Sequence, residues 1–356
     1  MKGRVKKITQ LLLISSLCTL NLTACINDNQ AVSEAVKINN NEIKIGVVVY
    51  NGKDPFIKSI CESIEEYKIE KEESSKVNIR IDVIDGEDNQ QIQNQKIDEM
   101  FKEDYDALAV NLVDRAQAAS IIDKAKEKDI PLVFFNREPV PQDMEKWDKV
   151  YYIGSKADQA GKMQGQILLD AIANGLEVDK NKDGVIQYVM LEGEQGHQDA
   201  ILRSYHSIKM LEDNEIKTEN LATDTGSWKR SIANEKMKSW IEQHGNNIEV
   251  VMANNDEMAL GAIEALEASG YYTDGGNMIV LGVDGLEEGL KAIENGKMLG
   301  TVYNNAEVQG KYIFDTLYEL AIGIEPYNMK EKFDEEKYLW ASHEMINIEN
   351  IQEYKK

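Results

Sequence analysis

Oxygen ligands suited to a hard cation recur at alternate positions of the segment DKNKDGVIQ, which covers residues 179–187. Four side chains and one backbone carbonyl could contribute, from Asp179, Asn181, Asp183, Val185 and Gln187. Gly184 stands where such a loop turns sharply. This spacing matches the first three-quarters of an EF-hand calcium loop. The twelfth position is Met190, whose thioether is a poor calcium ligand, so the last carboxylate must come from elsewhere in the fold, or the site is weak.

A solvated turn without an ion is the alternative for this segment, because Asp, Asn and Gly are common turn formers. The agreement of six positions in register favours an ion. No second loop of this kind occurs in the sequence. We therefore expect one structural calcium ion rather than a sensor that opens and closes.

A second group of polar and aromatic residues follows the predicted strands in both halves of the chain. Its members are Asp54, Phe56, Asn111, His197, Asp199, Arg203, Trp228, Asn255, Asp284 and Asn304. The carboxyl ends of parallel strands are where open α/β sheets bind ligands. Carboxylates accept hydrogen bonds, amides donate and accept, and arginine donates in a fixed fork. With two flat aromatic faces, this combination suits a pyranose, which carries hydroxyls at its edge and C–H groups on its faces.

Each of these residues also has a purely structural interpretation. An Asp or Asn after a strand is usually a turn former or a helix cap, and His197 could cap a helix. Phe56 and Trp228 could belong to the core. Their coincidence in both halves favours a binding site. Neither a P-loop nor a dinucleotide-binding glycine motif follows Tyr50, so no phosphate-binding loop is predicted.

The elements that must position these residues alternate between strands and helices. Apolar runs predict strands at residues 43–50, 77–85, 107–111, 131–136, 150–153, 185–191, 216–223, 248–253, 279–284 and 299–304. Helical segments separate them, for instance at residues 55–68, 89–102, 115–128 and 305–322. Such alternation predicts an α/β fold with parallel sheets covered by helices on both faces. The length of 356 residues predicts two similar lobes, with a cleft between their strand ends.

The amino terminus predicts export. Residues 1–7 hold four basic side chains and no acid, and a short apolar stretch follows at residues 11–20. Small residues before Cys25 resemble a lipoprotein processing site, which implies a signal peptide at 1–24, a lipidated Cys25 and a polar tether at 25–41. Ordinary secretion is the alternative. Only Cys61 would then remain, so no internal disulfide is expected, and Cys61 is interpreted as a small buried apolar residue.

The charge of the chain excludes one class of partner. Lys and Arg number 40 against 63 Asp and Glu, a net charge of −23. Removal of the signal would take away four basic residues, leaving 36 minus 63, or −27. Phosphate contacts need basic patches, so a nucleic-acid partner is not expected.

Several strings make the chain resemble a known family. They are AVNLVD at 109–114, VFFN at 133–136, GHQD at 196–199, ANND at 253–256 and GVD at 282–284. The chain resembles the periplasmic galactose/glucose-binding proteins of sugar ABC transport, in the type I periplasmic-binding superfamily. The resemblance runs from about residue 43 to the last helix. The calcium-like loop is itself a mark of that subfamily.

The resemblance implies two Rossmann-like lobes joined by a three-crossover hinge, with crossings near Asn136, Tyr303 and Phe333. One lobe would comprise residues 42–135 and 305–333, and the other 136–303 and 334–356. The ten residues after the strands all match sugar-contacting positions. Phe56 and Trp228 would stack on the sugar, and Asp54 would contact the C4 hydroxyl. Glu249 would complete the calcium site. The loop at 271–277 is longer than usual, which leaves its contacts open.

The implied function is that of a lipid-anchored, monomeric, extracytoplasmic solute-binding protein with no enzymatic activity. It would capture D-galactose, D-glucose or a methyl-galactoside and deliver it to an ABC permease. The sequence does not rank galactose against glucose. A sensor that presents its ligand to a chemoreceptor or a histidine kinase is the main alternative, and another monosaccharide is a further one. A glycosidase is disfavoured, because the three acids lie on different strands, each beside an amide or Arg203.

Overall fold

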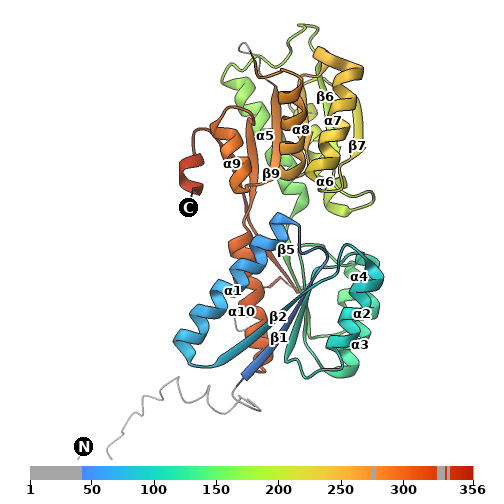
Figure 1. Ribbon diagram of the computed structural model, residues 1–356, viewed down its shortest axis with the longest axis vertical. Coiled ribbons are helices and arrows are strands. Elements are labelled where there is room, and N and C mark those ends of the chain that lie inside the picture. The colour runs from blue at the N-terminus through green and yellow to red at the C-terminus, as the bar shows by residue number, and fades with distance from the viewer. Residues whose placement is uncertain (1–41, 274–277, 327–332, 335–336, 356) are drawn as a thin grey trace, which may run out of the picture. The chain divides into compact units, whose positions relative to one another are not determined.

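The computed structural model describes residues 42–273, 278–326, 333–334 and 337–355 (Figure 1). The predicted signal peptide, Cys25 and the tether lie outside these residues, as do positions 274–277 of the long loop. Within the described part of the chain, no helix has the length and apolar character needed to cross a membrane.

The first lobe, termed the N lobe, is built on a six-stranded parallel sheet with the order β11-β5-β4-β3-β1-β2. Its strands are β1 (Glu42–Val49), β2 (Asn78–Asp85), β3 (Ala107–Val110), β4 (Leu132–Phe135), β5 (Val150–Ser155) and β11 (Tyr338–Ala341). The residues of β3 and β4 are buried throughout. Continuous apolar runs of this kind are typical of strands covered on both faces.

Helices cover both faces of this sheet. The helices are α1 (Pro55–Ser75), α2 (Gln90–Met100), α3 (Ala118–Lys128), α4 (Pro141–Met144) and α10 (Ala306–Ala321), with a 3₁₀ turn η1 (Arg115–Gln117) before α3. Helices α1 and α10 pack together, and their residues Ile60 and Phe314 belong to one core. Met100 of α2 and Ile122 of α3 belong to a second core. Each sheet face therefore has its own apolar layer.

The second lobe, termed the C lobe, repeats this plan with the strand order β12-β10-β9-β8-β6-β7. Its strands are β6 (Ile186–Glu192), β7 (Thr218–Thr225), β8 (Val250–Ala253), β9 (Ile279–Asp284), β10 (Gly300–Asn304) and β12 (His343–Asn347). All pairs are parallel except β10 with β12. An antiparallel edge strand on an otherwise parallel sheet is common in α/β folds.

Helices again form two layers in the C lobe. They are α5 (Ala157–Ala173), α6 (Gln198–Asp213), α7 (Arg230–His244), α8 (Asp256–Ala268) and α9 (Glu287–Glu294), with the 3₁₀ turns η2 (Gly245–Asn247) and η4 (Ile351–Tyr354). Leu168 and Leu211 of α5 and α6 share one core, and Met237 and Leu266 of α7 and α8 share the other. Two lobes of parallel-dominated sheets flanked by helices confirm the predicted fold class.

The crossings between the lobes correct the predicted boundaries. β5 pairs with β4, and β11 pairs with β5, so both strands belong to the N lobe. The chain therefore crosses after Ser155 and after Ala341, and the predicted crossings near Asn136 and Phe333 were wrong. The predicted crossing near Tyr303 agrees with the structure, because β10 lies in the C lobe and α10 packs on the N-lobe sheet. The choice of sheet depends on long-range pairing, which the local sequence of β5 does not reveal.

Candidate functional site

A cavity of about 40 Å³ lies where the strand ends of the two lobes meet. Eight of the ten predicted sugar-contacting residues line it, namely Asp54, Phe56, His197, Asp199, Arg203, Trp228, Asn255 and Asp284. Tyr50, Ile57, Asn136 and Arg137 complete the lining. Because about 10–15 Å³ of such space holds one water molecule, the cavity holds only a few waters, and a sugar fits only when the lining side chains shift.

Larger hollows adjoin this cavity. An outer cleft of about 930 Å³ shares Tyr50, Asp54 and Trp228 with it. A hollow of about 540 Å³ shares the lining residues Phe56 and Asp284 with the cavity. A small molecule therefore has room to reach the lining residues once the lobes separate.

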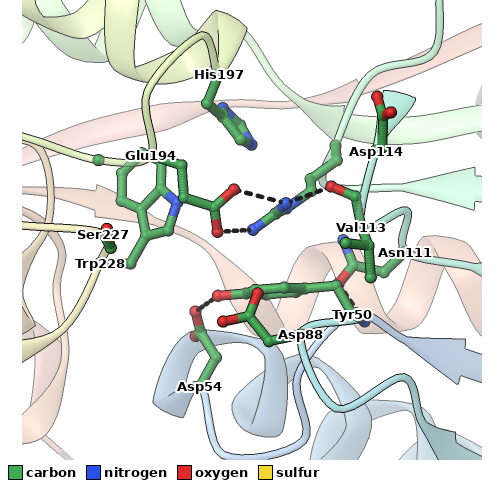
Figure 2. Close-up of polar contacts among 12 residues, drawn as sticks. Tyr50, Asp54, Asp88, Asn111, Val113, Asp114, Glu194, His197, Ser227 and Trp228 are labelled. Carbon is green, nitrogen blue, oxygen red and sulfur yellow. Dashed lines mark hydrogen bonds and ion pairs between the residues drawn. The ribbon is translucent and has the colours of Figure 1, made fainter. Parts of the chain in front are cut away.

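Asp54 occupies the turn between β1 and α1. Its Oδ1 accepts hydrogen bonds from the backbone N–H groups of Phe56 at 2.8 Å and Ile57 at 3.1 Å, which caps the helix. Its other oxygen accepts from the Tyr50 hydroxyl. The positive end of the helix dipole favours a negative charge at this point. The carboxylate is thus held at the cavity by its own helix and by Tyr50 (Figure 2).

His197 caps α6 and faces the cavity as a neutral donor. Its Nδ1 accepts from the backbone N–H of Asp199 at 3.1 Å, so in the neutral ring the proton is on Nε2. Burial, with the nearby charges of Arg137 and Arg203, lowers the pKa of His197 well below its usual value. The ring meets Trp228 edge to face, with 5.2 Å between centroids. At neutral pH it therefore offers an N–H to an acceptor.

Arg203 is a buried cation with unused capacity. It is 5% exposed, and it donates to the Asn254 carbonyl at 2.8 Å and to Asp199 at 3.5 Å. Its Nε has no hydrogen-bond partner among the described residues. Burial raises the pKa of Asp199, although the Arg203 charge opposes this. Buried donors are normally satisfied, so the free Nε–H marks a place for a ligand acceptor.

Strained backbone gathers around the cavity. Asn136, Trp228 and Asp284 have φ values of 60°, 62° and 127°. Non-glycine residues in such regions cost about 1–3 kcal/mol each and cluster at functional sites. Because all three line the cavity, the fold tolerates this strain where side chains must be aimed at a ligand.

Asp256 holds the strained segment at Asp284 and was not predicted as a functional residue. It accepts from Thr301 Oγ1 at 2.6 Å and from the Leu286 N–H at 2.8 Å. Burial raises its pKa to about 7. A Cβ at Gly282 or Gly289 would come within 2.1 or 2.5 Å of its carboxylate oxygens. The closely spaced glycines in β9 and α9, Gly282 and Gly289, are the sequence signal that could have indicated this packing.

Two predicted contact residues do not line the cavity. Asn111 is fully buried and bonded within the protein, where it accepts from the Tyr50 N–H and donates to the Phe135 carbonyl and to Asn136. Asn304 lies in the adjoining 540 Å³ hollow and accepts from Gln309 at 2.7 Å. Asn111 thus supports the turns behind the site, and Asn304 stands beside it.

Arg137 is the main residue of the cavity that the sequence did not indicate. It lies just after β4, is 4% exposed, and donates to Glu194 of the C lobe at 2.7 and 3.0 Å. An arginine between polar neighbours in a loop is ordinarily expected at the surface. Its burial depends on Glu194 in the other lobe and on the Val113 carbonyl and the Tyr50 ring in its own, and no local sequence pattern indicates these partners.

The predicted calcium loop and Glu249 come together. Asp179 accepts from the Asp183 and Gly184 N–H groups, and Gly184 has a φ of 80°. Glu249 precedes β8, is 1% exposed, and accepts from the N–H groups of Lys180 at 2.5 Å and Gln187 at 3.0 Å. In the described residues, no three His, Cys, Asp or Glu side chains form a metal cluster. The donor set here also includes amide oxygens and a carbonyl, and oxygen ligands of this kind suit calcium.

Comparison with known proteins places the chain in a family. The family model described as periplasmic binding protein domain matches residues 45–325. The chain is 38% identical to the D-galactose/methyl-galactoside binding periplasmic protein MglB of Haemophilus influenzae, over 79% of this chain and 82% of that one. It is 29% identical to a xylitol-binding protein of Mycolicibacterium smegmatis, over 82% of this chain and 74% of the relative.

Solved structures agree with this assignment. A solute-binding protein of an ABC transporter from Bacillus halodurans, with bound myo-inositol, is 26% identical and has a TM-score of 0.72, covering 89% of this chain and 98% of that one. The chain therefore belongs to the periplasmic binding protein family, as an extracytoplasmic sugar-binding protein of ABC transport, a family of solute-binding rather than catalytic proteins.

Proposed function

We propose that this protein captures D-galactose or D-glucose, or a methyl-galactoside, between its lobes and delivers it to an ABC permease. The observation that carries the proposal is the convergence of eight predicted sugar-contacting residues from both lobes on one cavity. The 38% identity to a galactose/methyl-galactoside binding relative supports the choice of a hexose. A monomer suffices for this function, because one chain supplies the whole lining.

The chemistry of the lining suits a pyranose. Phe56 from the N lobe and Trp228 from the C lobe offer flat faces to the C–H groups of the ring. Asp54, Asp199 and Asp284 accept hydrogen bonds from hydroxyls, while Arg203 and the Nε2–H of His197 donate. Because only the closed arrangement satisfies both halves of the site, the sugar shifts the protein toward that arrangement.

The proposal includes two further features. A single calcium ion would be held by Asp179, Asn181, Asp183, the Val185 carbonyl, Gln187 and Glu249, and would stabilise the loop before β6. A lipid on Cys25 would tether the protein to the outer face of the cell membrane. The approach of Glu249 to the loop supports the first feature, and the processing-site pattern before Cys25 supports the second.

A different ligand is the second candidate, because relatives and structural neighbours are described as binding xylitol, ribose or myo-inositol. Presentation of the same sugar to a chemoreceptor or a histidine kinase would use the same cavity and remains compatible with it.

Isothermal titration of the mature chain in calcium tests the proposal, with galactose, glucose, ribose, xylitol and myo-inositol as ligands. We expect saturable one-to-one binding of galactose or glucose and no heat from ribose. Binding of xylitol or myo-inositol alone would keep the site but replace the ligand class. No binding of any of the five by a folded protein would overturn the proposal.

A further inference from the structure

Arg137 and Glu194 join the two lobes beside the cavity, because Arg137 lines the cavity and Glu194 lines the adjoining outer cleft. Arg137 follows β4 in the N lobe, and Glu194 follows β6 in the C lobe. The guanidinium donates through both terminal nitrogens to both carboxylate oxygens, at 2.7 and 3.0 Å (Figure 2). The Arg137 side chain is 5% exposed, and that of Glu194 is 28% exposed. This is a two-point, largely buried ion pair between the lobes.

Contacts within the N lobe aim Arg137 at its partner. The Val113 carbonyl accepts from its Nη1 at 2.8 Å, and its guanidinium carbon lies 3.7 Å from the centre of the Tyr50 ring. Tyr50 in turn donates its hydroxyl hydrogen bond to Asp54. One continuous set of contacts therefore runs from Glu194 through Arg137 and Tyr50 to Asp54, a predicted sugar ligand. The state of the ion pair is thus connected to the geometry of the site.

A second ion pair between the lobes is of a different kind. Lys229 contacts Asp88 through a single carboxylate oxygen at 2.9 Å, with side chains 46% and 34% exposed. Exposed pairs contribute little, because water competes for both charges. A planar two-point pair that is shielded from water is stronger, and loss of one partner leaves a buried charge uncompensated.

We propose that Arg137 and Glu194 form a clasp that holds the lobes together beside the cavity, so that breaking it speeds the escape of bound sugar. The sugar part of this inference rests on the proposed function, but the clasp itself does not. Arg137 is a positioning residue, since it acts through Glu194, Tyr50 and Asp54. When the lobes separate, Arg137 and Glu194 return to water, and the pair then contributes nothing to ligand retention.

The kinetic test uses the mature chain carrying Arg137→Ala, Arg137→Lys, Glu194→Gln, or Arg137→Ala with Glu194→Gln. Asp88→Asn, which breaks the exposed pair, is the matched control. Stopped-flow tryptophan fluorescence with D-galactose gives association and dissociation rates. We expect dissociation to rise at least about tenfold in Arg137→Ala and Glu194→Gln, with smaller changes in association. Arg137→Lys keeps the charge but loses the fork, so its dissociation rate should fall between wild type and Arg137→Ala.

The double variant shows whether Arg137 and Glu194 slow sugar release as one pair or through two independent interactions. If the residues act as a pair, it releases galactose no faster than the more affected single variant. Asp88→Asn should stay within about threefold of wild type. Unchanged dissociation in folded Arg137→Ala and Glu194→Gln, or fully additive effects, would overturn the clasp.

A measurement without sugar keeps the clasp testable if galactose does not bind. Small-angle X-ray scattering of the ligand-free proteins should give a larger radius of gyration for Glu194→Gln and Arg137→Lys than for wild type and Asp88→Asn. Equal radii in all four proteins would overturn the clasp. Failure of wild type to bind any sugar would instead overturn the proposed function alone.

Discussion

Several side chains at the cavity both cap a helix and line the cavity, two roles that the sequence left as alternatives. Asp54, His197 and Asn255 each cap a helix through one atom, to backbone N–H groups of α1, α6 and α8. The same residues line the cavity. Capping fixes the side-chain rotamer at the edge where the strand ends converge. A capping role therefore does not argue against binding, because the cap preorganises the ligand group.

Trp228 and Asp284 give the most direct residue-scale prediction. We expect Trp228→Ala and Asp284→Ala each to lower sugar affinity at least about 100-fold, which would abolish measurable binding. Trp228→Ala removes a stacking face, and Asp284→Ala removes a buried acceptor. Titration calorimetry checks the affinity, and circular dichroism checks that the fold remains.

Trp147→Ala and Asp148→Ala are the matched controls, because neither residue lines the cavity. Both should bind as wild type does. Tight binding retained in both Trp228→Ala and Asp284→Ala would show that the ligand lies elsewhere.

The calcium prediction depends on the arrangement of the strands in the C lobe. The loop before β6 and the residue before β8 are brought together because those strands are neighbours, with Tyr188 opposite Val250 in the register. Glu249 already accepts from backbone N–H groups of the loop, so part of its contribution does not require an ion. A bound ion would add an interaction that depends on the full carboxylate charge.

We therefore expect Glu249→Gln to lower the melting temperature by several degrees more in calcium than in excess chelator. Differential scanning fluorimetry in both conditions measures this, with the exposed Glu242→Gln as a control that should change neither value. An equal loss in calcium and chelator would leave Glu249 with the hydrogen-bonding role alone.

The whole molecule interleaves its two lobes along the chain. β5 precedes the C lobe and β11 follows it, yet the two pair side by side in the N lobe. The segment after residue 337 supplies an edge strand to each sheet. No single cut of the chain therefore yields two complete lobes, and a ligand that contacts both lobes stabilises both.

This predicts how the protein responds to heat. Galactose at about 100 times its Kd should stabilise the protein by about 2.7 kcal/mol and raise the transitions of both lobes together in differential scanning calorimetry. In Trp228→Ala the same galactose concentration should cause no shift. A shift confined to one of two separate transitions would mean that the ligand contacts only that lobe.

Local sequence was enough to predict much of this protein. The apolar runs predicted the parallel strands because strands buried on both faces need continuous apolar residues. Polar residues just after the strands mark the edge where open α/β sheets bind ligands. Eight of ten proposed contacts reached the cavity on that basis. The helix α1 ran on to Ser75, beyond the predicted end at residue 68, because no Gly or Pro interrupts it before the left-handed Lys76.

Tertiary structure alone decided which sheet β5 and β11 join, that Asn111 turns inward to bond three neighbours, and that Arg137 meets Glu194. Each depends on groups far apart in the chain, 57 residues apart for the ion pair. The periodicity of apolar residues indicates which face of a segment is buried, and the spacing of polar residues indicates which atoms can form hydrogen bonds. A buried strand edge, amide or charge needs a partner, and many segments could supply one locally. The packing of the entire fold selects the partner, because only one arrangement pairs all of these groups at once.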